Sequence, residues 1–254
     1  MSDYSLRKRC STMAIHTSIQ VQHVNKQFGE KAVLQDITLA VPSAQIFGLL
    51  GPSGSGKTTL VRLIAGIDAP TSGTVEVLGE RMPQLAMLSK IGYMAQSDAL
   101  YAELTAQENM EFFASLYGLA GAKRKQRIQD VMELVDLGPH LKKQVSNYSG
   151  GMKRRLSLAI SLLHEPSILI LDEPTVGIDP VLRKSIWDEL TTLSRKGTTI
   201  LVTTHVMDEA DKCHQLGMIR DGRLTAVGTP EELKQATSSS TIEEAFLYYG
   251  GVRA

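Results

Sequence analysis

The stretch AQIFGLLGPSGSGKTTL, residues 44–60, decides the fold of this chain. Residues 44–51 form a continuous apolar run, which predicts a strand buried on both faces of a sheet. The glycine-rich stretch that follows, Gly51–Thr58, matches the pattern G-x-x-x-x-G-K-[ST]. Residues 57–67 then carry apolar side chains at helical spacing, with Ile67 as the last of them. Strand, glycine loop and helix in this order predict a phosphate-binding loop at the start of a helix.

The residue types of the glycine loop indicate which part of a nucleotide each would hold. Three glycines let backbone N–H groups curl around phosphate oxygens. Lys57 would reach the terminal phosphates, and the Thr58 hydroxyl would bind Mg²⁺. The predicted nucleotide-binding residues of the loop are Gly51, Pro52, Ser53, Gly54, Ser55, Gly56, Lys57, Thr58 and Thr59.

A pair of acidic residues ends a second apolar run. The stretch SILILDEP, residues 167–174, delivers Asp172 and Glu173 to the carboxyl end of a buried strand, where ligands bind in open α/β sheets. Two carboxylates buried together are costly unless a cation compensates them. We therefore predict that Asp172 holds Mg²⁺ through a water molecule and that Glu173 accepts the proton of an attacking water.

Strands and helices alternate along most of the chain, with a helical stretch in the middle. Further strands are predicted at 18–28, 73–79, 90–96 and 198–205, and helices at 105–119, 126–138 and 179–197. This order predicts one α/β core with a helical subdomain inserted into it. The predicted boundaries are a disordered N-terminal extension at 1–16, a discontinuous ATP-binding core at 17–98 and 165–232, a helical subdomain at 99–164 and a C-terminal helical tail at 233–254.

The helical stretch contains a second candidate anion site. NYSGGMKRR, residues 147–155, places a serine and two glycines directly before a predicted helix. Small residues there expose backbone N–H groups at the positive end of the helix dipole. Ser149, Gly150 and Gly151 therefore predict a phosphate contact, although the chain already has a complete phosphate loop.

The overall composition is that of a folded protein without a strong electrostatic field. Of 254 residues, 43% are hydrophobic and 21% are charged, and 27 Lys and Arg balance 27 Asp and Glu. This balance disfavours nucleic acid as a partner. The two cysteines, Cys10 and Cys213, favour a reducing compartment over a disulfide framework. We find no stretch of the roughly 20 apolar residues that a membrane span needs.

Together these motifs closely resemble those of the nucleotide-binding subunit of an ATP-binding cassette (ABC) transporter. The resemblance spans residues 18 to about 233 and rests on an ordered set of motifs: GPSGSGKT, Gln96, YSGGM, ILILDEP, GIDP and His205. It implies an α/β fold, a P-loop NTPase (RecA-like) core with an inserted α-helical subdomain and a small antiparallel β region. It also implies ATP and Mg²⁺ as ligands and ATP hydrolysis as the activity.

The resemblance implies roles for residues whose types alone say little. Phe28 would stack on adenine, Gln96 would link Mg²⁺ and the attacking water to the helical subdomain, and His205 would contact the γ-phosphate. Asp179 would communicate across a dimer interface. The predicted catalytic residues are Lys57, Gln96, Glu173 and His205, and the predicted Mg²⁺ residues are Thr58, Gln96 and Asp172.

The family also implies a use for the second anion site. Two nucleotide-binding subunits meet head to tail, so that Ser149, Gly150 and Gly151 of one subunit cap the ATP held by the other. The common signature is Leu-Ser-Gly-Gly-Gln, whereas this chain has Tyr148 and Met152 at the outer positions. A methionine donates none of the hydrogen bonds of a glutamine, so only the three central residues carry the implied phosphate role.

The segments YSGGMKRRL, VGIDP and TAQENMEFFASLYGL resemble most the exporter branch, which serves drug resistance, natural-product efflux and lipid or glycan export. The resemblance implies an integral membrane permease, contacted by residues 97–104, and a homodimer or heterodimer with a second nucleotide-binding subunit. We expect a peripheral protein on the cytoplasmic side of the cell membrane, with no nucleic acid as partner.

An importer ATPase and a soluble ATPase of the cluster-assembly kind stay open as alternatives to an exporter ATPase. Relatives that act in DNA repair or translation fit less well, because this chain has one cassette and no sustained heptads. A small-molecule kinase would leave the second anion site unexplained.

Overall fold

The structure, a computed structural model, describes residues 16–251, so the extension predicted at 1–16 lies almost wholly outside the described residues. The strands are β1 (Thr17–Phe28), β2 (Lys31–Pro42), β3 (Ile46–Leu50), β4 (Ser72–Val77), β5 (Glu80–Arg81), β6 (Ile91–Met94), β7 (Ile168–Asp172), β8 (Thr199–Thr204), β9 (Gln215–Arg220) and β10 (Arg223–Gly228). The α-helices are α1 (Lys57–Ile64), α2 (Ala106–Leu116), α3 (Gly121–Leu134), α4 (Gly150–Leu162), α5 (Pro180–Arg195), α6 (Met207–Ala210), α7 (Pro230–Ala236) and α8 (Ile242–Tyr249). Short 3₁₀ turns lie at Leu85–Ser89, Gly138–His140 and Val145–Asn147.

The larger of two sheets carries the predicted site residues at one edge. Its strand order is β10-β9-β3-β8-β7-β6, and all of its strands except the edge strand β10 run parallel. Parallel pairing brings the carboxyl ends of β3, β6, β7 and β8 to the same edge. The smaller sheet, in the order β2-β1-β4-β5, is antiparallel, which confirms the predicted small antiparallel β region.

The buried strands separate two hydrophobic cores. Along β3, Phe47 and Leu49 pack into a core shared with α1 and the antiparallel sheet, whereas Ile46 and Leu50 pack into a core shared with the other helices. Because successive side chains of a strand point to opposite faces, an unbroken apolar run supplies both cores. The continuous run in the sequence therefore reports a strand covered on both sides.

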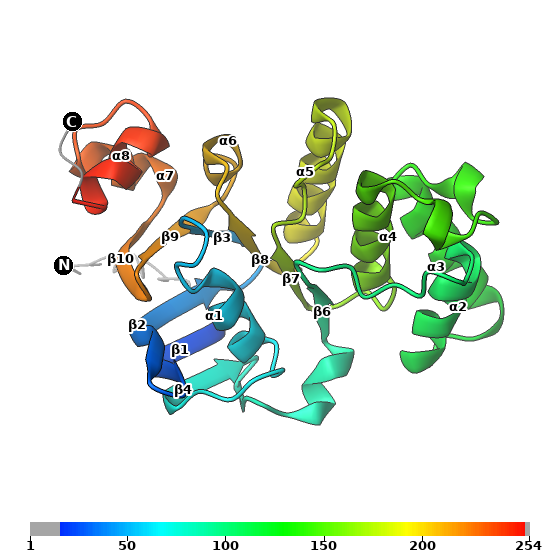
Figure 1. Ribbon diagram of the computed structural model, residues 1–254, viewed down its shortest axis with the longest axis horizontal. Coiled ribbons are helices and arrows are strands. Elements are labelled where there is room, and N and C mark those ends of the chain that lie inside the picture. Colours follow the sequence, from blue (N-terminus) through cyan, green and yellow to red (C-terminus); the bar gives the residue numbers. More distant parts are fainter. Residues whose placement is uncertain (1–15, 252–254) are drawn as a thin grey trace, which may run out of the picture.

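Three helices, α2, α3 and α4, occupy the interval between β6 and β7, where the sequence predicts the helical subdomain. Figure 1 shows them in green, gathered beyond β6 and β7 at the end of the molecule opposite the C-terminal helices α7 and α8. Thr105 and Glu108 form a capping box that starts α2. The division of the chain into domains stays a prediction, and α7 begins at Pro230, three residues before the predicted tail.

Several predicted elements differ from the structure, and for α1 and β2 the physical reason is identifiable. Helix α1 ends at Ile64 because Gly66 adopts a φ of +73°, and Ile67 lies outside the helix with 48% of its surface exposed. Helix α3 starts at Gly121, five residues before the prediction. Strand β2 is missing from the prediction, because the left-handed residue Asp36 interrupts its alternation.

Among residues 16–251 no helix is both long and apolar enough to cross a bilayer.

Candidate nucleotide-binding site

The glycine loop between β3 and α1 has the backbone geometry of an anion cradle. Gly54 has a φ of +80° with open space around its Cα, so backbone conformation alone favours glycine there. At Gly51 packing decides, because a Cβ atom would lie 2.3 Å from the carbonyl oxygen of Ile219. Gly56 precedes α1 and gives it no side-chain cap, so the first N–H groups of the helix face the loop.

The Lys57 side chain packs against the phosphate loop, to which it would contribute a positive charge. Its side chain is 5% exposed, and Nζ donates to the carbonyl oxygens of Gly51 (2.7 Å) and Pro52 (3.1 Å). Nζ also lies 3.8 Å from Oε1 of Glu173. Burial lowers the pKa of Lys57, while the carboxylates of Glu173 and Asp172 act in the opposite direction. The ammonium group is thus placed between the loop and the acidic pair.

The acidic pair ends β7 and is organised by the neighbouring strand β8. Asp172 is fully buried, and its Oδ1 accepts a hydrogen bond from the hydroxyl of Thr203, its register partner. The same hydroxyl accepts from the backbone N–H of Glu173 at 3.0 Å. Oδ2 of Asp172 is buried without a hydrogen-bond partner in the protein. A buried carboxylate oxygen that is left unpaired suits a cation or its bound water.

Glu173 stands in a strained backbone position at the mouth of the site. Its φ is +52°, a region that residues with a Cβ rarely adopt, and its side chain is 13% exposed. Oε1 lies 3.1 Å from Nδ1 of His205, which follows β8. The strained turn therefore directs this carboxylate towards Lys57 on one side and His205 on the other.

Residues from four separate parts of the chain meet around one small cavity. The cavity has a volume of about 210 Å³ and is lined by Val33, Ser53, Gly54, Gly56, Lys57, Thr58, Thr59, Gln96 and Glu173. The sequence predicts each of these except Val33. Four further predicted residues do not line the cavity. Gly51, Pro52 and the buried Ser55 belong to the same loop, and Asp172 directly precedes Glu173 in the chain.

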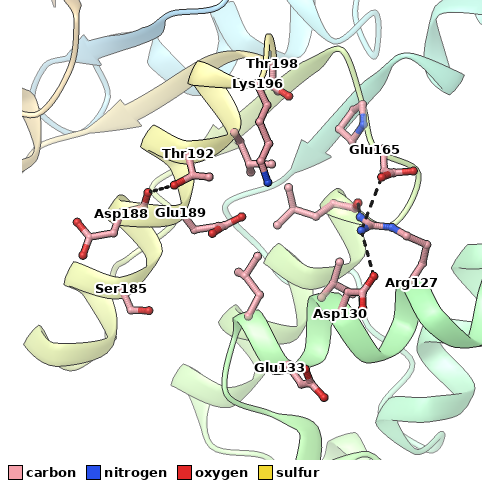
Figure 2. Close-up of a pocket in the computed structure, with 15 residues that line it drawn as sticks. Arg127, Asp130, Glu133, Glu165, Ser185, Asp188, Glu189, Thr192, Lys196 and Thr198 are labelled. Atoms are coloured by element: carbon pink, nitrogen blue, oxygen red, sulfur yellow. Dashed lines mark hydrogen bonds and ion pairs between the residues drawn. The ribbon is translucent and has the colours of Figure 1, made fainter.

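A larger cavity, of about 800 Å³, lies between α3 and α5 and contains none of the predicted site residues. Figure 2 shows its lining, in which Arg127 is paired with Asp130 (3.7 Å) and Glu165 (3.8 Å). Acidic side chains outnumber basic ones on its wall, which makes it unsuited to phosphate groups. The chemistry of the smaller cavity, rather than its size, identifies the candidate nucleotide site.

The second anion site lies apart from this cavity. Ser149 caps α4, its Oγ accepts from the N–H of Met152 at 3.3 Å, and Ser149 and Gly150 are both exposed. Neither these residues nor Gly151 line the cavity at the phosphate loop. The helix start is thus open to solvent and free to meet another molecule.

The two departures from the common signature have local roles in packing. Tyr148 is 5% exposed, and its hydroxyl donates to the carbonyl oxygen of His140 at 2.8 Å. Met152 packs against the hydrophobic core beneath the helical stretch. Both side chains therefore support the helix start without touching the candidate site.

Phe28 and Asp179 also lie outside the cavity. Phe28, at the end of β1, is 52% exposed, and Lys26 Nζ lies 4.8 Å from its ring centroid. Phe28 is therefore not a core residue, and its exposed ring could stack on the base of a nucleotide. Asp179 caps α5 by accepting from the N–H of Leu182 at 3.0 Å, so it has a structural role in the subunit itself.

Arg154 is a central residue that the sequence analysis missed. It lies in α4 with 6% exposure, and its guanidinium donates to four backbone oxygens: Ala95, Gln96, Asp172 and Glu173. Burial lowers its pKa, and Asp98 and Asp172 oppose that shift. One side chain of the helical stretch thus ties together the ends of β6 and β7. The available signal was a run of basic residues, KRR at 153–155, close to a helix N-terminus, where positive charge is disfavoured.

Comparison with known proteins agrees with this geometry. The family model described as ABC transporter matches residues 34–176. The chain belongs to the ABC transporter family. Its family and its fold are those of an ABC ATPase, a class of ATP-binding protein.

Several named relatives share this assignment. The chain is 40% identical over 238 residues to "Probable multidrug ABC transporter ATP-binding protein YbhF" of Escherichia coli (strain K12), a match that covers 91% of the chain and 41% of YbhF. It thus spans about two-fifths of that relative. It is 40% identical over 232 residues to "Nod factor export ATP-binding protein I" of Paraburkholderia xenovorans (strain LB400), covering 90% of the chain and 76% of that protein.

Among solved structures, the ABC ATPase resembles the ATP-binding cassette MJ0796, described as a dimer in a post-hydrolysis state bound to ADP and Pi. The TM-score is 0.78 at 26% identity, and the match covers 83% of the chain and 98% of that cassette.

Proposed function

We propose that this chain is the ATP-hydrolysing subunit of an ABC exporter, which powers the export of a drug, natural product, lipid or glycan through a separate membrane permease. The names of two relatives, a probable multidrug protein and a Nod factor export protein, support the export direction. The observation that carries the ATPase site is the convergence of Lys57, Gln96 and Glu173 on one cavity beside His205.

In the proposed mechanism the phosphate loop binds ATP, and Lys57 turns from the loop carbonyls to the terminal phosphates. Glu173 accepts the proton of the attacking water, and His205, at 3.1 Å from Glu173, contacts the γ-phosphate. The contact between Glu173 and His205 brings the two groups together, and groups that are positioned in advance lower the reorganisation that a reaction needs.

The residues present fit Mg²⁺. The Thr58 hydroxyl, the Gln96 amide oxygen and the unpaired Oδ2 of Asp172 are the hard oxygen donors that this ion prefers. When bound, Mg²⁺ would offset the negative charge of the phosphates. Among the described residues no group of three or more His, Cys, Asp or Glu could hold a metal ion. Phosphate oxygens would complete the coordination of Mg²⁺.

Two subunits, this chain paired with a copy of itself or with a second nucleotide-binding subunit, would complete two such sites. The dimeric arrangement of the MJ0796 cassette supports pairing, and the exposed start of α4 supports a phosphate contact in trans. Ser149, Gly150 and Gly151 would cap the γ-phosphate of the partner's ATP, and Asp179 would lie at the interface. ATP binding closes the pair, and hydrolysis reopens it.

An exposed aromatic surface at the helical subdomain supports a permease contact at the cytoplasmic face of the membrane. Tyr101 and Phe112 are 46% and 38% exposed, and their ring centroids lie 5.0 Å apart. Tyr101 belongs to the predicted contact segment 97–104, and Phe112 comes from α2 of the helical subdomain. An exposed aromatic pair is typical of a protein–protein interface.

The proposal is tested by purifying the tagged chain from detergent-solubilised membranes of its native host and identifying the co-purifying proteins by mass spectrometry. The expected result is a stoichiometric multi-span protein. The Phe112→Ser variant should no longer co-purify with this multi-span protein, although it should hydrolyse ATP at the normal rate. Leu85→Ser, at a site that is 83% exposed and outside this surface, is the matched control and should retain it. Recovery of soluble proteins alone would refute the exporter role and leave the ATPase site intact.

The site itself is tested with Glu173→Gln. Removing the base should slow hydrolysis by a factor on the order of 10²–10⁴ and leave ATP binding unchanged. This variant should form dimers on addition of ATP, as measured by light scattering, and the further change Ser149→Arg should prevent them. A monomer under all conditions would remove the support for the contact in trans.

A further inference from the structure

A buried carboxylate outside the predicted site joins the two loops that follow β7 and β8. Glu209 lies in the short helix α6, four residues after His205, with 2% exposure. Its two oxygens accept hydrogen bonds from the hydroxyls of Thr204 (2.7 Å) and Thr175. Thr204 directly precedes His205, and Thr175 comes two residues after Glu173. One side chain therefore holds both loops that continue from the catalytic strands.

The contact with Thr204 fixes the backbone around His205. The Thr204 hydroxyl donates to Glu209 and accepts from the N–H of Val206 at 2.9 Å, which closes a turn with His205 in the middle. Because a hydroxyl has a single proton to donate, the acceptor supplied by Glu209 determines how this turn is oriented. His205 is the residue whose ring lies 3.1 Å from Glu173.

The contact with Thr175 fixes the segment that ends at Asp179. Thr175 is held by Glu209 at the start of this segment, and the carbonyl oxygen of Ile178 accepts from Arg183 Nη2 at 3.2 Å near its end. Nε of Arg183 lies 4.0 Å from Oε1 of Glu209. A cation and two hydroxyls thus compensate the burial of one carboxylate.

We propose that Glu209 is a positioning residue for ATP hydrolysis, which sets the spacing between His205 and the segment 175–179 without touching substrate. This inference rests on the proposed function, in which Glu173 and His205 act on the same γ-phosphate. Networks of buried hydrogen bonds act as units, so loss of the shared acceptor should move both loops together.

The test is Glu209→Gln, which keeps the shape but replaces one acceptor oxygen with an amide donor. We expect kcat to fall on the order of 10²-fold, because a misplacement of about 1 Å costs roughly that much. KM for ATP should change by less than about threefold, since the phosphate loop is untouched. Rates are expressed per ATP-binding site, and the sites are titrated with a fluorescent nucleotide. A smaller amount of folded protein therefore does not lower the kcat that is measured. Asp208→Asn, the exposed neighbouring acid in α6, should keep the kcat of the wild type.

Conservative variants separate positioning from mere stability. Thr204→Ser and Thr175→Ser keep the hydroxyl and should retain kcat within about twofold. Thr204→Val and Thr175→Val remove the hydroxyl and should lower kcat as Glu209→Gln does. An unchanged kcat per site in Glu209→Gln, or equal losses in the serine and valine variants, would overturn the proposal. Glu173→Gln is measured alongside. If it is inactive while Glu209→Gln is normal, only the positioning role fails, whereas a normal rate in Glu173→Gln would refute the catalytic assignment itself.

Discussion

Replacing Arg154 by methionine tests how the helical subdomain is tied to the catalytic strands. Methionine replaces the aliphatic stem of arginine but leaves four backbone oxygens without their donor, three of them at 2.7–2.9 Å from the guanidinium. An unsatisfied buried acceptor costs about 1–3 kcal/mol, so four at the low end amount to about 4 kcal/mol. That loss would be a large fraction of the stability of a folded domain. ATP hydrolysis should fall as well, because the backbones of Gln96 and Glu173 lose a shared anchor.

Urea unfolding monitored by circular dichroism measures this effect as a lower midpoint at an unchanged slope. Lys153→Met, on the neighbouring position of α4, is the matched control and should change the free energy of unfolding by less than about 0.5 kcal/mol. Arg154→Lys should fall between the two, because an ammonium group lacks the planar fork that reaches several acceptors. A loss below about 1 kcal/mol in Arg154→Met would show that the network contributes no more than one ordinary hydrogen bond and would refute the reasoning.

Two further predictions concern the nucleotide and the pH dependence of stability. Phe28→Ala should weaken ATP binding about 5-fold or more and Phe28→Trp should preserve it, because stacking of a base on an aromatic ring contributes about 1–3 kcal/mol; equal affinities in a fluorescence titration would exclude the stacking role. Burial lowers the pKa of His164 from 6.5, partly opposed by its contact with the carbonyl of Ile91, and its ring stacks on Tyr117 at 3.7 Å. The unfolded chain therefore binds more protons than the folded chain, and the free energy of unfolding should fall as the pH drops below about 6.5, by at most about 1.4 kcal/mol per pH unit. His164→Phe keeps a stacked ring and should flatten this fall in urea midpoints between about pH 7 and pH 5, so an unchanged pH dependence in that variant would contradict the assignment.

The sequence by itself determined the fold class and the central part of the candidate site. The residues of the phosphate loop are consecutive in the sequence, so a single motif predicts their function. The apolar patterns on either side predict the flanking strand and helix without ambiguity. Asp172 and Glu173 could be predicted because parallel strands place their carboxyl ends at one edge, where ligands bind. His205 and Gln96 also end predicted strands, but only the family resemblance gave them a role. Local signals were insufficient where the backbone leaves regular geometry, as at Gly66 and in the bulged strand β2.

Tertiary structure alone decided which residues hold the site together. Arg154 reaches backbone oxygens that lie 18 to 59 positions away, and Glu209 reaches Thr175 across 34 positions. Backbone carbonyls are present at every residue and hydroxyls at many, so no spacing in the sequence distinguishes the ones that are contacted. The exposure of Phe28 and of Ser149 is likewise a property of the folded chain. A motif specifies the atoms that meet a ligand, whereas the packing of distant elements specifies the groups that hold those atoms in position.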